Sequence, residues 1–479
     1  MSAVIESTLP TQDPAAGMQA ILARQSESFL AELPVSARSR IERLDRVLKL
    51  LTTHDADLCE AMNRDFGQRP AMLSRFTDVA SSVGAVKHAR KHLRQWMKPR
   101  ASRVRFPLGL LGARATLQFQ PKGVVGIISP WNFPVNLAFV PLADALAAGN
   151  RVMIKPSEYT PHTSELMAEL VARYFKPEEV AVFPGGSETG IAFSRLPFDH
   201  LLFTGSTTVG HHIMRAAAEN LTPVTLELGG KSPAVIAPDA DLEKSAGRIV
   251  LGKLLNAGQV CLAPDYVLAP RARVPALVEQ LKRAYFQMYP DGPASPDYTS
   301  IIDQRQLDRL QDYLAQARDH GVEIITLGEA AGDRRLPLSL LMDPDDSLKV
   351  MKDEIFGPLL PIKGYDSLDQ AVAYINAHPR PLGLYLFGGG ADQRRQVLDR
   401  TISGGVTLDD VIFHVSAEEL PFGGIGASGM GAYHGEIGFQ TFSHAKAVYR
   451  QSPLNMGKLL GLAPPYGKRL KQVVDWDMK

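Results

Sequence analysis

Five short apolar runs decide the fold of this chain: VVGII (124–128), RVMIK (151–155), VAVF (180–183), HLLFT (200–204) and VTLEL (224–228). Between them, the segments SELMAELVARYF and VGHHIMRAAAEN carry apolar residues at helical spacing. Strands that alternate with helices form βαβ units, which build a parallel sheet with helices on both faces. We therefore predict an α/β fold, with a second α/β stretch at about 239–410.

The sequence on either side of this stretch predicts helix and extended chain. Apolar residues recur at helical intervals between Ser36, which is suited to cap a helix, and Gly67, which is suited to end one. We expect one helical segment there. The Gly-punctuated segment LGLLGARATLQFQ, between Pro107 and Pro121, is expected to be extended and to pair at a sheet edge or with another subunit.

The composition is that of an ordinary globular protein, and it excludes several function classes. A chain of 479 residues is too long for one compact core, so we expect two or three folding units. A formal net charge of +1 lacks the basic excess typical of nucleic-acid binding. No apolar run approaches the roughly 18 residues of a membrane helix, and the start resembles no signal peptide. Two cysteines, Cys59 and Cys261, exclude a disulfide framework and indicate a reducing, cytoplasmic compartment.

Two generic patterns in the sequence do not predict a site. Gly424, Gly426 and Gly429 match G-x-G-x-x-G, but their flanks, ELPF and GAYHGE, are not the strand and helix that a dinucleotide fingerprint needs. His211 and His212 are adjacent, and neighbouring residues on a helix point in different directions. We therefore expect no metal site.

Three residues have the types that acyl or aldehyde chemistry uses. Cys261, in NAGQVCLAP, is expected on a loop before the apolar run YVLA, although most free cysteines are simply small buried hydrophobes. Glu227 lies at the end of a predicted strand, where α/β proteins place their sites, although a glutamate there is more often a solvated or capping residue. Asn132, in SPWNFP, could donate to an oxyanion or be a turn residue. Spacing alone does not show that the three meet.

Seven short segments, taken in order, give the chain a family resemblance. They read SPWNFP, KPSE, FTGSTTVG, LELGGKSP, GQVCLAP, EIFGP and PFGGIGASGMG. The chain resembles the NAD(P)-dependent aldehyde dehydrogenases across about 27–450. The resemblance implies a Rossmann-like cofactor domain (1–106 and 122–226), an α/β catalytic domain (227–410), a small β oligomerisation element (107–121 and 411–450) and a C-terminal tail (451–479).

The resemblance also implies a role for each of the three candidate residues. Cys261 would attack the aldehyde and form a thiohemiacetal, and Asn132 with the backbone N–H of Cys261 would hold the oxyanion. Glu227 would then activate the water that hydrolyses the thioester left after hydride transfer. Each role suits its residue type, because a thiolate is nucleophilic, an amide donates without titrating, and a desolvated carboxylate can accept a proton near neutral pH.

The cofactor implied by the resemblance is NAD, with NADP as the alternative. The residues placed there by matching motifs are Trp131, Lys155, Glu158, Gly205, Ser206, Gly210, Glu354 and Phe356. Lys155 and Glu158 resemble the pair that contacts the adenosine ribose, and Glu354 with Phe356 resembles the pair that positions the nicotinamide ribose and ring. Because a carboxylate repels a 2′-phosphate, Glu158 favours NAD.

Within the family the chain resembles the class 3 branch. That resemblance implies a homodimer and an aromatic, coniferaldehyde-like, or medium-chain aldehyde as substrate. The tail is interrupted by Pro464 and Pro465, so no membrane anchor is expected. Candidates for the wall of the substrate tunnel are Phe133, His414, Tyr433 and Phe439, each of which could instead be core or interface.

Three alternative functions stay open from the sequence. A CoA-acylating aldehyde dehydrogenase would resolve the thioester with a thiol, but members of that branch usually lack the glutamate found here as Glu227. A catalytically silent relative would have lost Cys261, Glu227 or Asn132, and all three are present. A cysteine hydrolase would pair Cys261 with a histidine base, for which we find no signature.

Overall fold

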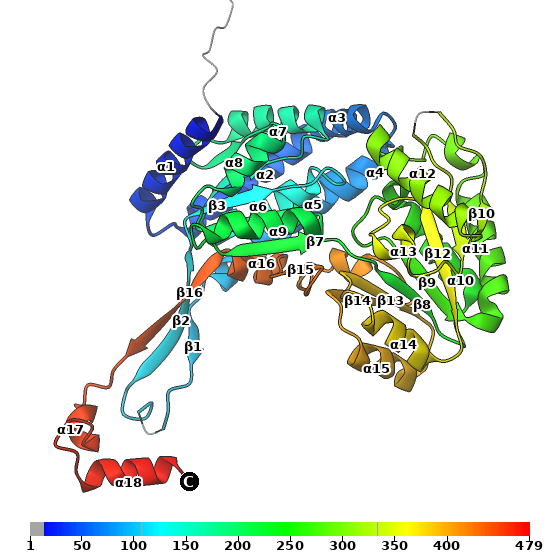
Figure 1. Cartoon of the computed structure of the whole chain (residues 1–479). Coiled ribbons are helices and arrows are strands. Elements are labelled where there is room, and N and C mark those ends of the chain that lie inside the picture. The colour runs from blue at the N-terminus through cyan, green and yellow to red at the C-terminus, as the bar shows by residue number, and fades with distance from the viewer. Residues whose placement is uncertain (1–13, 107, 333) are drawn as a thin grey trace, which may run out of the picture.

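The computed structural model describes residues 14–106, 108–332 and 334–479 and shows two α/β lobes with a projecting arm (Figure 1). The first residues of the chain, on which the expectation of no signal peptide rests, lie outside the described residues. Each lobe is built around its own sheet, and a third sheet forms the arm. In the described part of the chain, no helix has the length and apolarity needed to cross a membrane.

The first lobe contains a six-stranded sheet in the order β15-β7-β6-β3-β4-β5. Its strands are β3 (Val124–Ile128), β4 (Arg151–Lys155), β5 (Val180–Val182), β6 (His200–Gly205), β7 (Val224–Leu228) and β15 (Gly429–Met430). All five predicted strands are present and mutually parallel, so this prediction is confirmed. The short β15 was not predicted; it runs antiparallel to β7 and comes from the Gly-rich segment near the C-terminus.

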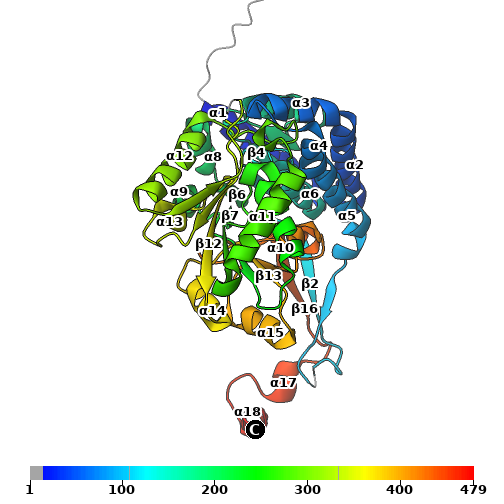
Figure 2. The same ribbon diagram turned by 90° about the vertical axis from the view of Figure 1, so that its right-hand side faces the viewer.

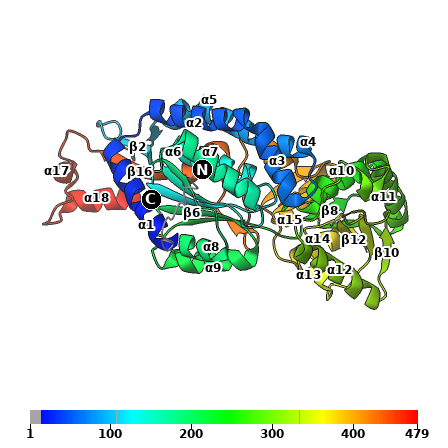
Figure 3. The ribbon, with the colours of Figure 1, turned by 90° about the horizontal axis from the view of Figure 1, so that it is seen from above.

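Helices cover both faces of this sheet, as Figure 3 shows from above. They are α1 (Pro14–Glu32), α2 (Ala37–Thr53), α3 (Asp55–Phe66), α4 (Ala71–Ser74), α5 (Ser81–Trp96), α6 (Asn136–Ala148), α7 (Pro161–Tyr174), α8 (Ser187–Ser194) and α9 (Thr207–Ala218). Helices α2, α5, α6 and α7 lie on one face and α8 and α9 on the other. A π-helical turn, η1 (Arg75–Ala80), joins α4 to α5.

The helical segment predicted between Ser36 and Gly67 is two helices rather than one. The Ser36 hydroxyl accepts from the N–H of Ser39 at 3.1 Å, and Gly67 ends α3 with φ +79°, so both predicted ends are confirmed. The break falls at His54. It follows two threonines, which are weak helix formers, and α3 opens with two aspartates in its first turn, where negative charge stabilises a new helix.

The second lobe, which faces the viewer in Figure 2, contains a seven-stranded sheet in the order β10-β11-β12-β9-β8-β13-β14. Its strands are β8 (Pro233–Ile236), β9 (Tyr266–Pro270), β10 (Glu323–Thr326), β11 (Ser339–Met342), β12 (Leu359–Tyr365), β13 (Gly383–Phe387) and β14 (Gly405–Leu408). Its helices are α10 (Leu242–Leu254), α11 (Val274–Met288), α12 (Gln304–Asp319), α13 (Lys349–Lys352), α14 (Leu368–Asn376) and α15 (Ala391–Arg400).

A three-stranded antiparallel sheet forms the arm that projects from the first lobe (Figure 1). Its strands are β1 (Arg100–Ser102), β2 (Arg114–Pro121) and β16 (Ser443–Arg450), and α16 (Gly435–Thr441), α17 (Met456–Leu460) and α18 (Lys468–Asp477) belong to the same C-terminal region. The segment predicted to be extended is a strand only from Arg114. Residues 108–112 form turns, because their glycines favour reversal of the chain over strand pairing.

Candidate active site

The candidate residues gather where the first sheet faces the second lobe. Asn132 follows β3, Lys155 ends β4, Gly205 ends β6 and Glu227 lies near the end of β7. Because these four strands are parallel and adjacent, their carboxyl ends share one edge of the sheet. Cys261 reaches this edge from the other lobe, on the loop between α10 and β9.

The loop that presents Cys261 has a strained backbone. Asn256, Ala257 and Gly258 have φ values of +50°, +54° and +78°, which only glycine adopts readily. The Asn256 amide nitrogen donates to the carbonyl oxygens of Asn132, at 3.1 Å, and of Gln259, at 3.2 Å. Such strain persists only where the surroundings over-determine the conformation. The hydrogen bonds therefore fix the approach of the chain to Cys261.

Gln259 locks the same loop onto the second lobe. Its side chain is fully buried; the amide nitrogen donates to the carbonyl oxygens of Asn256, at 2.9 Å, and Ser300, at 3.1 Å, and the amide oxygen accepts from the N–H of Ile302 at 2.9 Å. A buried side chain that satisfies three hydrogen bonds has one orientation. Gln259 thus holds the backbone two residues before the cysteine.

Asn132 points its amide toward the cysteine loop. Its side-chain nitrogen donates to the carbonyl oxygen of Gln259 at 3.1 Å, and its own carbonyl oxygen accepts from Arg69 at 2.7 Å. Arg69 forms a buried ion pair with Asp78, at 2.6 Å. Both side chains of the pair are fully buried, so the segment that carries Asn132 rests on a rigid polar support.

Glu227 is buried without a hydrogen-bond partner. The residue is 2% exposed, and neither carboxylate oxygen bonds to any described residue. In the antiparallel pair of β15 with β7, Gly429 lies directly opposite Glu227. Burial raises the pKa of the Glu227 carboxyl well above its usual value. An unpartnered carboxyl is costly for stability, so its presence calls for a functional explanation.

Cys261 keeps part of its surface exposed. Desolvation, together with the negative charges of Glu354 and Glu227, raises the pKa of the Cys261 thiol to about 12. Because the charge of Glu227 affects the Cys261 thiol, the predicted nucleophile and the predicted base lie in one site. In this state the cysteine is a thiol, and activation requires a positive charge or a proton acceptor nearby.

The predicted cofactor residues line the same sheet edge. The Lys155 ammonium donates to the Glu158 carboxylate at 3.0 Å. Ser206 caps α9, its hydroxyl accepting from the N–H of Val209 at 3.4 Å. The α9 N-terminus therefore lies beside Gly205, at the end of β6.

On the second lobe, two predicted cofactor residues lie opposite that edge. The Phe356 ring packs edge-on against Trp131, with 5.3 Å between ring centroids. The Glu354 carboxylate covers Gly229, where a Cβ would overlap it. Glycine at this position therefore allows the two lobes to meet closely.

These features fit a nicotinamide dinucleotide. The N-terminus of α9 offers unpaired N–H groups to a pyrophosphate, and Glu354 Oε1 is buried without a partner among the described residues. A Cβ at Gly210 would press on Leu228 at 2.8 Å, so glycine keeps the first turn of α9 close to the sheet. Carboxylates that accept from ribose hydroxyls would then lie at both ends of the site.

Sequence reasoning missed the residues that support this site. Arg69, Asn256 and Gln259 bond to Asn132, and Asp78 pairs with Arg69. Of these four, Asn256 and Gln259 belong to NAGQVCLAP, a segment that the sequence singled out, whereas Arg69 and Asp78 do not. Arg69 and Asp78 look like an ordinary exposed pair on a helix. Asp78 lies in a π-helical turn, and such turns are frequent at functional sites. A single sequence does not reveal a π-helical turn, so this signal could be found only in the structure.

The four candidates for a tunnel wall separate into two kinds. Phe439 is fully buried and packs on Trp96 and Phe119, at 5.8 Å from each ring, so it belongs to the core between α5 and the arm. Tyr433 is 1% exposed and interacts electrostatically with Glu227 and Cys261. Phe133 and His414 are partly buried. These three remain candidates for the wall.

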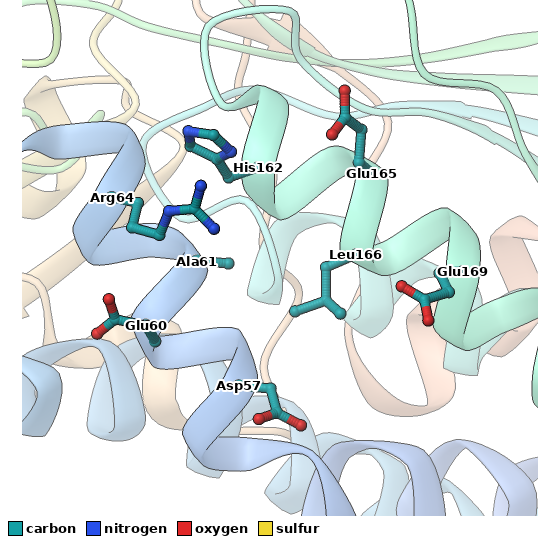
Figure 4. Close-up of a pocket in the computed structure, with 8 residues that line it drawn as sticks. All are labelled: Asp57, Glu60, Ala61, Arg64, His162, Glu165, Leu166 and Glu169. Carbon is teal, nitrogen blue, oxygen red and sulfur yellow. The ribbon is translucent and has the colours of Figure 1, made fainter. Parts of the chain in front are cut away.

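Two other features lie away from the site. A groove of about 580 Å³ between α3 and α7 contains none of the predicted residues (Figure 4). It is lined by Asp57, Glu60, Ala61, Arg64, His162, Glu165, Leu166 and Glu169. His211 and His212 are exposed on α9, and within the described ranges no cluster of three metal-ligating side chains occurs.

Comparison with known proteins gives the family. The family model described as "Aldehyde dehydrogenase family" matches residues 11–448. A Caulobacter vibrioides protein named "Probable coniferyl aldehyde dehydrogenase" is 53% identical, over 96% of this chain and 97% of that protein. "Aldehyde dehydrogenase family 3 member B3" of Mus musculus is 38% identical, over 95% of this chain and 94% of that protein. The substrate-bound state of Staphylococcus aureus AldH has a TM-score of 0.90 at 35% identity, covering 96% of this chain and 99% of that one.

The chain belongs to the aldehyde dehydrogenase family and is an oxidoreductase. The resemblance to this family, including its class 3 branch, is confirmed by these matches. The α/β fold is confirmed by the likeness to the AldH structure. A solved aldehyde dehydrogenase from Bacillus cereus with this fold is an NAD+ complex, which supports NAD as the cofactor here.

Proposed function

We propose that the chain oxidises an aldehyde to its carboxylic acid with NAD+, with Cys261 as nucleophile, Asn132 as oxyanion donor and Glu227 as general base. The observation that carries this proposal is the buried, unpartnered Glu227 carboxyl beside a partly exposed Cys261. The Asn132 amide, which bonds to the same loop as Cys261, supports it further. One site thus holds a nucleophile, a donor and a proton acceptor.

The first half of the reaction forms a thioester on Cys261. The Cys261 thiol loses its proton to solvent, the sulfur attacks the carbonyl carbon, the C–S bond forms, and the negative charge that moves to oxygen is held by the Asn132 amide and the Cys261 N–H. Bound NAD+ would supply a positive charge and the acceptor for the hydride from that carbon. Because burial and the charges of Glu354 and Glu227 raise the Cys261 pKa to about 12, we expect the cysteine to become reactive only after the cofactor binds.

The second half hydrolyses the thioester. Glu227 takes a proton from water, whose oxygen attacks the carbonyl carbon, and the C–S bond breaks to give the acid and the Cys261 thiolate. Burial raises the pKa of Glu227 well above its usual value, which makes the carboxylate a stronger proton acceptor than an exposed one. A CoA-dependent acyl product would instead favour the acylating alternative.

We place the cofactor along the edge of the six-stranded sheet. Lys155 and Glu158 would hold the adenosine ribose, the α9 N-terminus at Ser206 the pyrophosphate, and Glu354 the nicotinamide ribose. Trp131 and Phe356, whose rings contact each other, would flank the nicotinamide end. The side-chain carboxylate of Glu158 supports a preference for NAD over NADP, since it would repel a 2′-phosphate.

For the substrate we propose a coniferaldehyde-like aromatic aldehyde. The name of the Caulobacter vibrioides relative supports this choice. Cys261 shares its hydrophobic cluster with the partly buried Phe133, Leu255, Ile412 and Val415, side chains suited to an apolar substrate. The test follows NADH absorbance with coniferaldehyde, benzaldehyde, hexanal and acetaldehyde. Coniferaldehyde should give the largest kcat/KM, and a clear preference for acetaldehyde would refute the substrate class.

We further propose a cytoplasmic homodimer that assembles through the arm. The arm exposes Leu110, Tyr449 and Trp476, at 80%, 50% and 59%, and its outer strands β1 and β16 leave unpaired edges. Exposed apolar side chains and open strand edges are typical of an association surface. Size-exclusion chromatography with light scattering should give twice the chain mass, and a monomer would contradict this proposal.

A further inference from the structure

Helix α10 carries a buried ammonium group that the chemistry above does not use. Lys253 is 0% exposed, and its Nζ has no hydrogen-bond partner among the described residues. Lysine is almost never fully buried unless it is paired, because desolvating an ammonium is strongly unfavourable. We therefore expect the Lys253 ammonium to have a partner to which it is not hydrogen-bonded in this structure.

Three charged groups interact with Lys253, namely Asp265, Lys231 and Glu354. Asp265 is fully engaged: one oxygen is paired with Lys231 and the other accepts from the N–H of Ile355 at 2.9 Å. Lys231 also donates to the carbonyl oxygens of Val350, at 2.8 Å, and Asp353, at 2.9 Å. Of the two acids, Glu354 is the one with an oxygen that has no partner among the described residues, namely its buried Oε1.

The backbone brings the two unpaired groups onto neighbouring segments. A Cβ at Gly258 would overlap the carbonyl oxygen of Gly357 and lie 3.0 Å from that of Lys253. The end of α10 is therefore packed on the loop that carries Glu354. The same loop is held by Arg309, which donates to the carbonyl oxygen of Ile355 at 2.9 Å. With the backbone fixed, side-chain rotation is the freedom left to Glu354.

We propose that Lys253 is a positioning residue for the nucleotide site, which pairs with the Glu354 carboxylate and orients it toward the nicotinamide ribose. This inference rests on the proposed role of Glu354. The N–H of Gly230 already donates to the same carboxylate. Lysine would hold it from the protein side, leaving an oxygen lone pair for a ribose hydroxyl. Burial lowers the pKa of Lys253 to about 8 and raises the pKa of Glu354 to about 8.

The experiment measures NADH binding by fluorescence titration of the full-length protein, without substrate. We expect Lys253→Met to raise the Kd for NADH about tenfold, as for loss of one charge-assisted hydrogen bond. Glu354→Gln should do the same, and the double variant should be no weaker than the weaker single one, since both act through one contact. Lys253→Gln, which keeps a donor, should recover part of the affinity.

A matched control is Lys244→Met on the same helix, because the Lys244 side chain is 76% exposed. It should leave the Kd unchanged. If Glu354→Gln weakens NADH but Lys253→Met does not, or if the two effects multiply in the double variant, the inference fails and the proposed role of Glu354 stands. If Glu354→Gln itself has no effect, the proposed cofactor role fails with it. Should Lys253→Met not fold, Lys253→Gln alone decides, and an unchanged Kd overturns the inference.

Discussion

Asp78 and Glu227 are two buried carboxylates in the same lobe, and they differ in how they are bonded. Asp78 is 0% exposed and Glu227 is 2% exposed. Asp78 is paired with Arg69 at 2.6 Å and accepts from the backbone N–H groups of Val135, at 3.2 Å, and Asn136, at 3.3 Å. Glu227 has no partner among the described residues.

The difference separates a structural carboxylate from a chemically available one. Asp78 accepts from the N–H groups of Val135 and Asn136 and pairs with Arg69, which itself bonds to the carbonyl oxygen of Asn132. These bonds hold the segment after β3 in place. The lone pairs of Glu227 are free to accept a proton. Burial without bonds costs stability, which proteins tolerate where function requires it. We therefore expect substitution of Glu227 to lower mainly the activity and substitution of Asp78 to lower mainly the stability.

The largest loss of activity is expected from substitution of the nucleophile, Cys261. Cys261→Ala removes the atom that forms the thioester, so NAD reduction should fall by at least about 10⁴-fold. NADH absorbance with coniferaldehyde measures this, and the melting temperature controls for folding. Cys59→Ala is the matched control, since Cys59 is buried in α3, and it should keep activity. A fully active Cys261→Ala protein would mean that another residue is the nucleophile.

Glu227→Gln should lower kcat by about 10³-fold, the middle of the range for a general base. Stability should be unchanged or slightly higher, because the substitution removes an unpartnered ionisable group. Steady-state kinetics and chemical denaturation measure the two quantities. A marked loss of stability would show that Glu227 has a structural partner after all.

Asp78→Ala should lower stability more than activity, the reverse of the effect expected for Glu227→Gln. It leaves the Arg69 guanidinium buried without its counter-ion, which costs about 3–5 kcal/mol of unfolding free energy. The activity of the folded fraction should fall less than in Glu227→Gln. Denaturation midpoints compare the stability of the two variants directly. Equal stability of both would contradict the proposal that Asp78 is structural and Glu227 is not.

The pH dependence of stability should also distinguish Glu227. Its pKa is raised in the folded state from the ordinary 4.5. As pH rises above 4.5, the unfolded chain ionises this group while the folded protein keeps it protonated. The wild type should then lose stability relative to Glu227→Gln, by up to about 1.4 kcal/mol per pH unit, until the pH passes the folded pKa. Activity should rise over that interval, since only the carboxylate accepts a proton. A difference in stability that does not change with pH would contradict the raised pKa.

The smallest effect is expected at the far end of the cofactor site. Glu158→Ala removes the charge that would repel a 2′-phosphate, so the ratio of kcat/KM for NAD to that for NADP should fall about tenfold. Steady-state kinetics with each cofactor measures the ratio. A wild type that prefers NADP would refute the cofactor assignment.

The sequence predicted the part of the fold that local patterns determine. The five apolar runs became β3 to β7, and their order along the chain placed Asn132, Lys155, Gly205 and Glu227 at strand ends. Parallel strands then bring such residues to one edge, which is why the site could be anticipated. The family segments added Cys261, which reaches this edge from another lobe and which strand order alone does not place.

The remaining features depend on contacts between distant parts of the chain. Strand β15 is two residues long and forms only because Gly429 can approach β7, where a Cβ would overlap a backbone oxygen. Arg69 and Asp78 differ from surface residues only through burial by α6. Lys253 lies in an amphipathic helix like many other lysines. In each case the three-dimensional neighbours decide the role, and a single sequence carries no record of them.

The most direct test of the account follows Glu227→Gln in a rapid-mixing experiment with NAD and coniferaldehyde. If Glu227 acts only in hydrolysis, the variant should release about one NADH per active site in a burst and then stall. Mass spectrometry of the quenched protein should then find the acyl group on Cys261. A variant that shows no burst and no acylated cysteine, or one that turns over like the wild type, would contradict the proposal that the unpartnered carboxyl of Glu227 is the hydrolytic base.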